Sequence, residues 1–331
     1  MNTTHRDSLD LESLAPATVH HLWLSLGTDA LGQAVELPIL IARGAKPGPV
    51  FGITAALHGN EINGIPVLQR LVGELDVSRL RGTVVGVVVA NVPGFLGHRR
   101  TFLGGWDLNH LFPGKPNGHS GQVYVHRMMD RIIRHLDFLV DLHTASLGRV
   151  NSLYVRADMS SPETNRLARL QRPQLIVNNP PHDGTLRGAA AALGIPAITL
   201  EIGNPQRFQK DFIRRSVRGL RRVLMDQGMI RKRPLKEGQP PILCDRSSWL
   251  YTDAGGLLEI HPALLDHVRE GETVATLRDP FGNITATWTA PHDGVVIGKS
   301  VNPVAETGAR ILHLGVLSPD SPTPEIQQEE L

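Results

Sequence analysis

The stretch PVFGITAALHGNEINGIPVLQRLVGEL, residues 49–75, decides the fold. Its first nine residues form an almost continuous apolar run, which is typical of a strand buried on both faces of a sheet. From residue 61 onward, apolar side chains recur at helical spacing and predict a helix over 61–75. These side chains are Ile62, Ile65, Leu68, Leu71 and Val72. A buried strand followed directly by an amphipathic helix indicates an α/β domain.

The same alternation continues after this stretch. Further apolar runs predict strands over 83–92, 137–143 and 195–203. Helical patterns predict helices over 123–136, 161–171, 184–194 and 210–228. Because strands that alternate with helices favour a mostly parallel sheet flanked by helices, we expect an α/β domain over residues 17–230.

The sequence changes character after residue 230. Residues 231–241 are charged, contain three prolines and have no hydrophobic period, so we interpret them as a linker. Short apolar runs separated by turn signals then predict a small all-β domain over 242–317. We expect the polar ends of the chain, residues 1–16 and 318–331, to be flexible.

Composition narrows the classes of function. The 331 residues are 41% hydrophobic, which is enough for a sizeable core, and the formal net charge of +2 gives no support to binding nucleic acid. A single cysteine, Cys244, excludes a disulfide framework within the chain and a zinc or iron–sulfur site built from clustered cysteines. The fifteen histidines are a richer source of metal ligands.

The sequence also lacks the usual signals for membranes and export. No uncharged apolar run reaches the roughly 18 residues of a membrane-spanning helix, and the first residues lack the apolar segment of a secretory signal. We therefore expect a cytoplasmic protein without a membrane partner. The arginines within 214–222 fall largely on one helix face, which we interpret as a solvated surface. Whether the chain forms a homo-oligomer stays open.

Ionisable residues follow directly on three of the predicted strands. They occur in His58-Gly59-Asn60-Glu61, in Asp141-Leu142-His143 and in Glu201-Ile202-Gly203. Because ligands of open α/β sheets bind at the carboxyl ends of the strands, these three segments together predict one functional site.

His58 and Glu61 have the spacing His-x-x-Glu, which lets one loop or first helical turn direct both side chains at one ion. With His143 they would supply two imidazoles and a carboxylate, a ligand set that suits Zn²⁺ and leaves a fourth position for water. The alternative is that His58 caps a loop, Glu61 stabilises a helix N-terminus and His143 bonds within a turn. The spacing alone leaves both interpretations open.

Four segments, taken in order, resemble the succinylglutamate desuccinylase/aspartoacylase family. They are His58-Gly59-Asn60-Glu61, Asp107-Leu108-Asn109 before Phe112-Pro113-Gly114, Asp141-Leu142-His143-Thr144 and Leu200-Glu201-Ile202-Gly203. The resemblance extends from about residue 45 to about residue 315. It implies a zinc-carboxypeptidase-like fold and an amidohydrolase that removes the acyl group from a small N-acyl substrate. It also implies one Zn²⁺ per chain, held by His58, Glu61 and His143.

The resemblance implies roles for three further residues. Glu201 would take a proton from the attacking water and pass it to the leaving amine. Arg100, chosen from the pair Arg99-Arg100, would stabilise the oxyanion. Asp107 would lie behind His58 and fix its tautomer.

One position departs from the family pattern. The family usually has Asp-x-Asn-Arg, in which Asn and Arg hold the substrate carboxylate, whereas this chain has Asp107-Leu108-Asn109-His110. Histidine lacks the permanent charge and the bidentate fork of arginine. We therefore expect Asn109 and His110 to line a substrate site that prefers a less anionic, zwitterionic or amine-bearing N-acyl compound. Arg187 is a candidate for holding one carboxylate, and Arg156 is another.

The C-terminal segment resembles the family as well, through turns such as Gly255-Gly256-Leu257 and the Ala290-Pro291 that precedes Gly294. These turns resemble those of a barrel-sandwich hybrid, the β fold of lipoyl and biotinyl carriers. The predicted turn at 279–283 contains no lysine, so we expect no lipoyl or biotinyl group. In the family this domain narrows access to the zinc, which implies small substrates.

Two other functions are consistent with these residues. A carboxypeptidase-like enzyme would need an open cleft that admits a peptide. A metal-binding protein without catalysis would be expected to lack the carboxylate at Glu201, which is present here.

Overall fold

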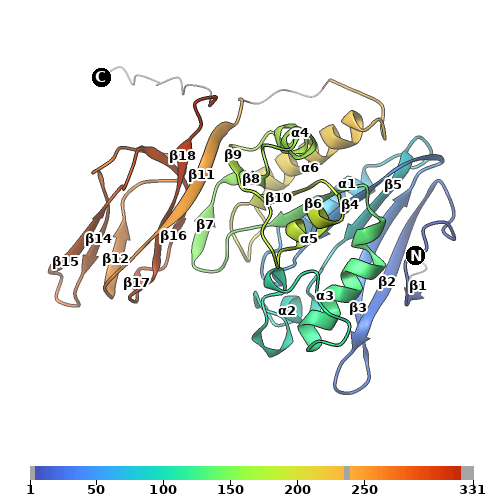
Figure 1. Ribbon diagram of the computed structural model, residues 1–331, viewed down its shortest axis with the longest axis horizontal. Helices are drawn as coiled ribbons and strands as arrows, with labels where there is room; N and C mark the ends of the chain where they lie inside the picture. Colours follow the sequence, from blue (N-terminus) through green and yellow to red (C-terminus); the bar gives the residue numbers. More distant parts are fainter. Residues whose placement is uncertain (1–3, 235–238, 322–331) are drawn as a thin grey trace.

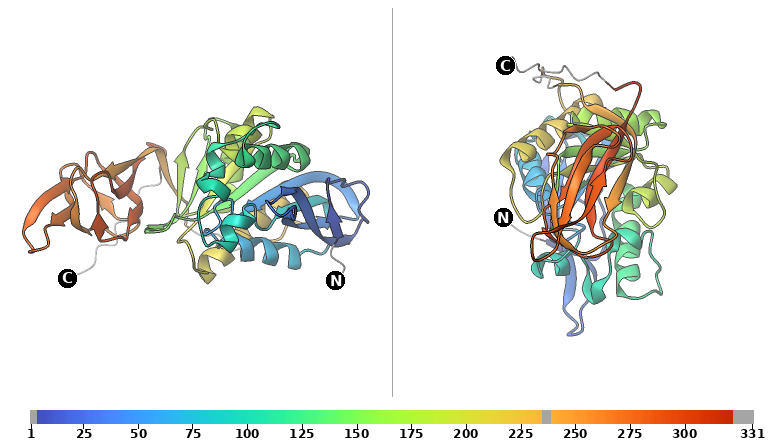
Figure 2. Two further views of the ribbon diagram at one scale, coloured as in Figure 1. Left: turned by 90° about the horizontal axis from the view of Figure 1, so that it is seen from below. Right: turned by 90° about the vertical axis from the view of Figure 1, so that its left-hand side faces the viewer.

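The computed structural model describes residues 4–234 and 239–321. A large α/β domain carries a β domain at the end opposite the N-terminus (Figure 1, Figure 2). The large sheet has parallel strands at its centre and helices on both faces, and the C-terminal domain is built from antiparallel strands. This architecture confirms the predicted fold class.

The described strands follow the chain from β1 to β18. They are β1 Thr4–Arg6, β2 Thr18–Thr28, β3 Ala34–Arg43, β4 Lys46–Ala55, β5 Arg81–Val87, β6 Phe138–His143, β7 Arg149–Asn151, β8 Leu153–Ala157, β9 Leu175–Asn178, β10 Ala197–Ile202, β11 Ile242–Tyr251, β12 Gly256–Ile260, β13 His267–Val268, β14 Thr273–Arg278, β15 Ile284–Thr289, β16 Gly294–Ser300, β17 Val304–Ala305 and β18 Arg310–Leu317.

The described α-helices are α1 Gly64–Gly73, α2 Val92–Leu96, α3 Ser120–Arg131, α4 Pro162–Gln171, α5 Leu186–Ala192 and α6 Lys210–Asp226. Short 3-10 helices cover Leu103–Gly105, Leu108–His110 and Ile133–His135. None of the helices within the described ranges is long and apolar enough to cross a membrane.

Three adjacent parallel strands, β4, β6 and β10, form the centre of the large sheet. At one end of these strands Ala55 of β4 pairs with Leu142 of β6, and His143 of β6 pairs with Glu201 of β10. The residues singled out by the sequence therefore meet at the carboxyl edge of the sheet, where α/β proteins bind their ligands.

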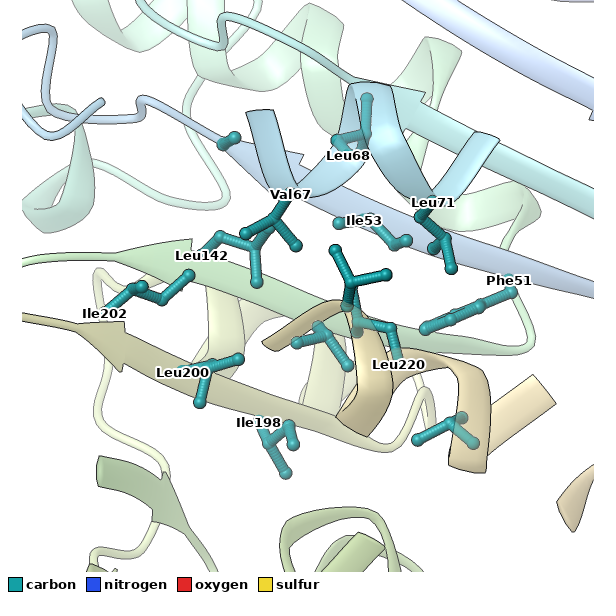
Figure 3. Packing of buried hydrophobic residues seen from close by; sticks show 14 of the residues in the cluster. Phe51, Ile53, Val67, Leu68, Leu71, Leu142, Ile198, Leu200, Ile202 and Leu220 are labelled. Carbon is teal, nitrogen blue, oxygen red and sulfur yellow. The ribbon is translucent and has the colours of Figure 1, made fainter. Parts of the chain in front are cut away.

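Helices cover both faces of this centre. Helices α1, α4 and α6 bury their apolar side chains on one face, and α3 and α5 do so on the other. Figure 3 shows Val67 and Leu71 of α1 near Ile53 and Leu142 of the sheet, with Leu220 of α6 close by. Burial on both faces explains why the central strands are almost continuously apolar.

The N-terminal segment differs from the expectation of a flexible lead-in over residues 1–16. Strand β1 pairs with β2, and Leu9 and Leu14 are buried in the same core as Leu24. The segment is polar overall, but its two buried leucines pack in one core with apolar residues of β2 and β3. Residues 1–3 lie outside the described residues.

The β domain consists of two antiparallel layers over one apolar core. Strand β11 pairs with β18 in the β domain and with β9 in the α/β domain, so one sheet continues from the first domain into the second. The predicted linker lies partly outside the described residues, at 235–238, and so does most of the predicted flexible tail, at 322–331.

Candidate active site

The first functional segment is the loop between β4 and α1. The chain leaves the strand through Ala56, whose φ of 52° lies in the left-handed region that non-glycine residues rarely adopt. Helix α1 begins at Gly64, not at Glu61 as predicted. His58 and Glu61 therefore lie together on the loop, where the amide of Glu61 donates to the carbonyl oxygen of His58 over 3.0 Å.

The side chains of His58, Glu61 and His143 converge at the sheet edge, and all three are buried. The Nδ1 atoms of the two histidines lie 3.2 Å apart. Each Nδ1 lies 3.0 Å from one carboxylate oxygen of Glu61. Burial opposes ionisation of Glu61, but the two neighbouring imidazoles outweigh it and hold the pKa of this carboxyl well below its usual range.

Two aspartates lie behind the histidines. The Nε2 of His58 lies 3.1 Å from Asp107 Oδ1, and the Nε2 of His143 lies 2.7 Å from Asp141 Oδ2. Because a carboxylate can only accept, each Nε2 carries a proton, and loss of the second ring proton would leave the lone pair of each Nδ1 directed at the cluster centre. Two imidazole lone pairs and a carboxylate facing one another repel unless a cation lies between them, so these residues could hold a metal ion.

Glu201 lies next to the cluster, on the strand paired with that of His143. The carboxylate is buried, and burial raises the pKa of Glu201 above its usual range although the Arg156 guanidinium opposes this. Arg156 lies 3.5 Å from Glu201 Oε1, and Asn151 Nδ2 lies 3.4 Å from Glu201 Oε2. Both contacts are long, so these neighbours bind the carboxylate only weakly.

Of the Arg99-Arg100 pair, only Arg100 lines the site cavity. Its Nη1 donates to Glu61 Oε1 over 2.9 Å, and its Nε donates to Asp107 Oδ2 over the same distance. Nη1 also donates to Ser146 Oγ over 2.7 Å. Arg100 thus places a positive charge beside the cluster of His58, Glu61 and His143, and it binds both carboxylates that contact the His58 ring.

The cluster opens into a cavity of about 560 Å³ that also contains the three predicted substrate-binding residues. The Oδ1 of Asn109 accepts from the amide of Leu186 over 2.9 Å. The side chain of His110 is 72% exposed, and its Nε2 lies 3.9 Å from Asp107 Oδ2. Arg187 is buried and donates to the backbone and side chain of Asn179.

The sequence assigned no individual role to Asp141, although its segment was part of the predicted site, and it gave no sign of Trp249 or Arg310. Asp141 stands two residues before His143 on β6, so both side chains lie on the same face of the strand and meet. The two-residue spacing of Asp141 and His143 could therefore have predicted their contact from the sequence. Trp249 and Arg310, which line the cavity from the β domain, lie far along the chain and carried no such signal.

Two imidazoles, their aspartate partners and the carboxylates of Glu61 and Glu201 lie in one polar cavity at the sheet edge, and three of these side chains, His58, Glu61 and His143, could hold a metal ion. Residues 47–226 match the sequence profile of the succinylglutamate desuccinylase/aspartoacylase catalytic domain. The chain belongs to this family of hydrolases that remove acyl groups from N-acyl compounds, which confirms the resemblance carried by its four motifs.

Known relatives agree with this assignment. The chain is 25% identical to the N-alpha-acetyl-L-2,4-diaminobutyric acid deacetylase of Halomonas elongata, over 85% of this chain and 86% of the relative. A succinylglutamate desuccinylase from Silicibacter sp. TM1040 has a TM-score of 0.82 at 23% identity and covers 92% of this chain and 98% of its own. The product-bound ectoine utilization protein EutE (DoeB) from Ruegeria pomeroyi has a TM-score of 0.82 at 20% identity, with coverages of 91% and 97%. The two structural similarities show a shared fold.

Replacement of Gly59 with alanine is expected to destabilise the site loop. A Cβ there would lie 2.0 Å from the carbonyl carbon of Gly94 and 2.1 Å from the amide nitrogen of Phe95, both backbone atoms of α2. Overpacking of this kind typically costs about 1–3 kcal/mol. Thermal unfolding of the Gly59→Ala protein should therefore show a lower Tm than the parent.

Gly73→Ala is the matched control, because a Cβ at Gly73 meets nothing within 4 Å. This control should unfold at or slightly above the Tm of the parent, since alanine favours a helix more than glycine does. A Gly59→Ala protein that is as stable as Gly73→Ala would show that the loop is not tightly packed against α2.

Proposed function

We propose that this protein is a zinc-dependent deacylase that hydrolyses the amide bond of a small N-acyl amino acid, with Glu201 as the proton carrier. The observation that carries the proposal is the meeting of His58 Nδ1, His143 Nδ1 and the Glu61 carboxylate, with Glu201 on the adjacent strand. Two neutral imidazoles and one carboxylate form a ligand set typical of catalytic zinc.

The aspartates support the choice of metal ligands. Asp107 and Asp141 accept the Nε2 protons of His58 and His143, which fixes each ring orientation and leaves Nδ1 to bind the ion. Zinc bound by these three side chains would lower the pKa of a water ligand towards 7 and polarise the substrate carbonyl.

Glu201 then has the central role among the residues of the chain. Its carboxylate accepts a proton from the attacking water and later donates that proton to the nitrogen of the leaving amine. The raised pKa of Glu201 suits both halves of this task, because a carboxyl that ionises less readily holds the proton between them.

Arg100 acts on the other side of the reacting carbonyl. Its guanidinium is held by Glu61, Asp107 and Ser146, so it is oriented before the substrate binds. A preoriented cation stabilises the negative charge that develops on the carbonyl oxygen.

The cavity supports a small substrate that carries an amine. Trp249 and Arg310 of the β domain form part of the cavity wall, which favours a compact N-acyl compound over a long peptide. His110 replaces the arginine that the family uses for a carboxylate, and the relative from Halomonas elongata acts on an acetylated diamino acid. We therefore propose N-alpha-acetyl-L-2,4-diaminobutyrate or a close analogue as the substrate.

A substrate panel tests this proposal. Zinc-loaded protein is incubated with N-alpha-acetyl-L-2,4-diaminobutyrate, acetylaspartate, succinylglutamate and a blocked dipeptide, and amine release is followed. We expect the highest kcat/KM on the diamino compound. Cleavage of the dipeptide alone would identify a carboxypeptidase-like enzyme, and no release from any compound would refute the deacylase.

His110→Arg is expected to shift the substrate preference towards dicarboxylic compounds. The exposed side chain at 110 lines the cavity, and arginine would add a permanent charge and a bidentate donor there. Since a hydrogen bond to a charged group contributes about 1.5–3 kcal/mol, kcat/KM for acetylaspartate should rise by about 10- to 100-fold.

The matched control for this variant is His135→Arg, at an exposed position away from the cavity. This control should leave the preference unchanged. Parent enzyme that already favours acetylaspartate, with no change on His110→Arg, would show that another residue replaces the arginine of the family.

A further inference from the structure

Two arginines from different domains lie over one tryptophan in the wall of the active-site cavity. Arg149 begins β7 of the α/β domain, Arg310 begins β18 of the β domain, and Trp249 belongs to β11. The guanidinium carbons lie 5.6 Å and 5.3 Å from the centre of the Trp249 ring. The same ring stacks on His313, with centroids 5.0 Å apart and planes 7° from parallel.

These two guanidinium groups differ from Arg100 and Arg156 of the same cavity, whereas the buried Arg187 donates to Asn179. Arg100 pairs with Glu61 and Asp107, while Arg156 contacts Tyr154 and Glu201. Within the described residues, neither Arg149 nor Arg310 forms an ion pair with an acidic side chain. Besides the Trp249 ring, Arg310 contacts Tyr251, to whose hydroxyl its Nε donates over 3.4 Å.

Arg149 lies near like charges, and the carboxylates of Glu61 and Glu201 act on it more weakly than Arg310 and Arg100 do. Burial, followed by the charges of Arg310 and Arg100, lowers the pKa of Arg149 to about 10, so this group still carries its proton at neutral pH. A carboxylate near both guanidinium groups would remove the repulsion, and guanidinium groups bind carboxylates with directed, charge-assisted hydrogen bonds.

We propose that Arg149 and Arg310 bind the carboxylate of the substrate and position its amide at the metal-ligand cluster. This inference rests on the proposed function and adds the residues that recognise the substrate carboxylate. The β domain then supplies one of the two arginines of the carboxylate site, Arg310. With the carboxylate bound by this pair, the enzyme needs no arginine at position 110. The substrate class is an N-acyl amino acid with a free carboxylate, and N-acyl amines without one are poor substrates.

A purely structural role makes a different prediction. If the Arg149–Trp249–Arg310 stack only fastens the two domains together, its loss lowers the Tm and reduces activity on every substrate equally. A role in carboxylate binding affects only compounds that carry the carboxylate, and it appears in KM more than in kcat.

The test compares N-alpha-acetyl-L-2,4-diaminobutyrate with N-acetyl-1,3-diaminopropane, which has the same amide and amine but no carboxylate. Turnover of both is measured for the parent, Arg149→Gln and Arg310→Gln. Arg246→Gln, on the same strand as Trp249 but outside the cavity, is the control.

Arg149→Lys and Arg310→Lys retain a positive charge, and they replace the glutamine variants in the test if those variants do not fold. Calorimetric binding of 2,4-diaminobutyrate and 1,3-diaminopropane to each zinc-loaded protein gives a readout independent of turnover.

Each glutamine variant should raise KM for the carboxylate substrate by about 10- to 100-fold, in line with the loss of a charged hydrogen bond. Neither should change kcat/KM for N-acetyl-1,3-diaminopropane. The lysine variants should fall in between, and Arg246→Gln should match the parent.

Absence of turnover in the parent would refute the proposed function, and binding would then decide the inference. Preferential binding of 2,4-diaminobutyrate that is lost in Arg149→Gln and Arg310→Gln would support it. Parent protein that does not distinguish the two binding probes, or variants that weaken both probes equally, would overturn it.

Discussion

Glu201→Gln is expected to retain zinc but to lower kcat by about 10²–10⁴-fold, the usual contribution of a general acid–base group. Glutamine has nearly the same shape and still fits between Asn151 and Arg156, so the fold and the metal ligands are unaffected. It cannot accept a proton from water or return one to the amine. The measurement is single-substrate kinetics together with metal analysis of the same sample.

Glu259→Gln is the control for this change, because Glu259 is an exposed glutamate on β12. It should behave as the parent does. Glu201→Gln with a kcat within a few-fold of the parent would mean that another group carries the proton.

His143→Ala should abolish stoichiometric zinc binding and, with it, activity. The variant loses one of three protein ligands and leaves Oδ2 of the buried Asp141 without its histidine partner. Since removal of even an outer partner typically lowers metal affinity about 10–100-fold, the loss of a direct ligand should exceed about 100-fold. Zinc affinity is measured by competition with a chromogenic chelator.

The control here is His267→Ala, an exposed histidine of the β domain. It should bind one equivalent of zinc as the parent does. A His143→Ala protein that keeps full zinc occupancy and activity would refute the three-ligand assignment.

The core of the α/β domain was predictable because its elements follow simple periods. The apolar run at 49–57 and the helical pattern after it correspond to β4 and α1, although the helix begins three residues later than predicted. Helix α4 begins at Pro162, within one residue of the predicted start at 161, with the Ser161 hydroxyl accepting from the Thr164 amide. Hydrophobic periodicity and helix-capping residues were sufficient to predict these elements.

The N-terminal hairpin was missed although its pattern was present. Leu22, Leu24 and Leu26 alternate along β2 and are buried, while the residues between them are half-buried. Trp23, which lies between Leu22 and Leu24, weakens the contrast between the two faces of the strand.

The part of the site contributed by the β domain could not be predicted. Trp249 and Arg310 reach the cavity only because β11 joins β9 and pairs with β18, a topology that no local period encodes. In contrast, His58, His143 and Glu201 were found because strand ends of a parallel sheet meet at one edge.

The central claim is that zinc bound by His58, Glu61 and His143 enables this protein to deacylate a small N-acyl compound. The most direct measurement is a titration of metal-free protein with zinc while amine release from N-alpha-acetyl-L-2,4-diaminobutyrate is followed. We expect activity to rise linearly and to reach its plateau at about one zinc per chain, as the single three-ligand site requires. Full activity in the metal-free protein, or no amine release at any zinc concentration, would contradict it.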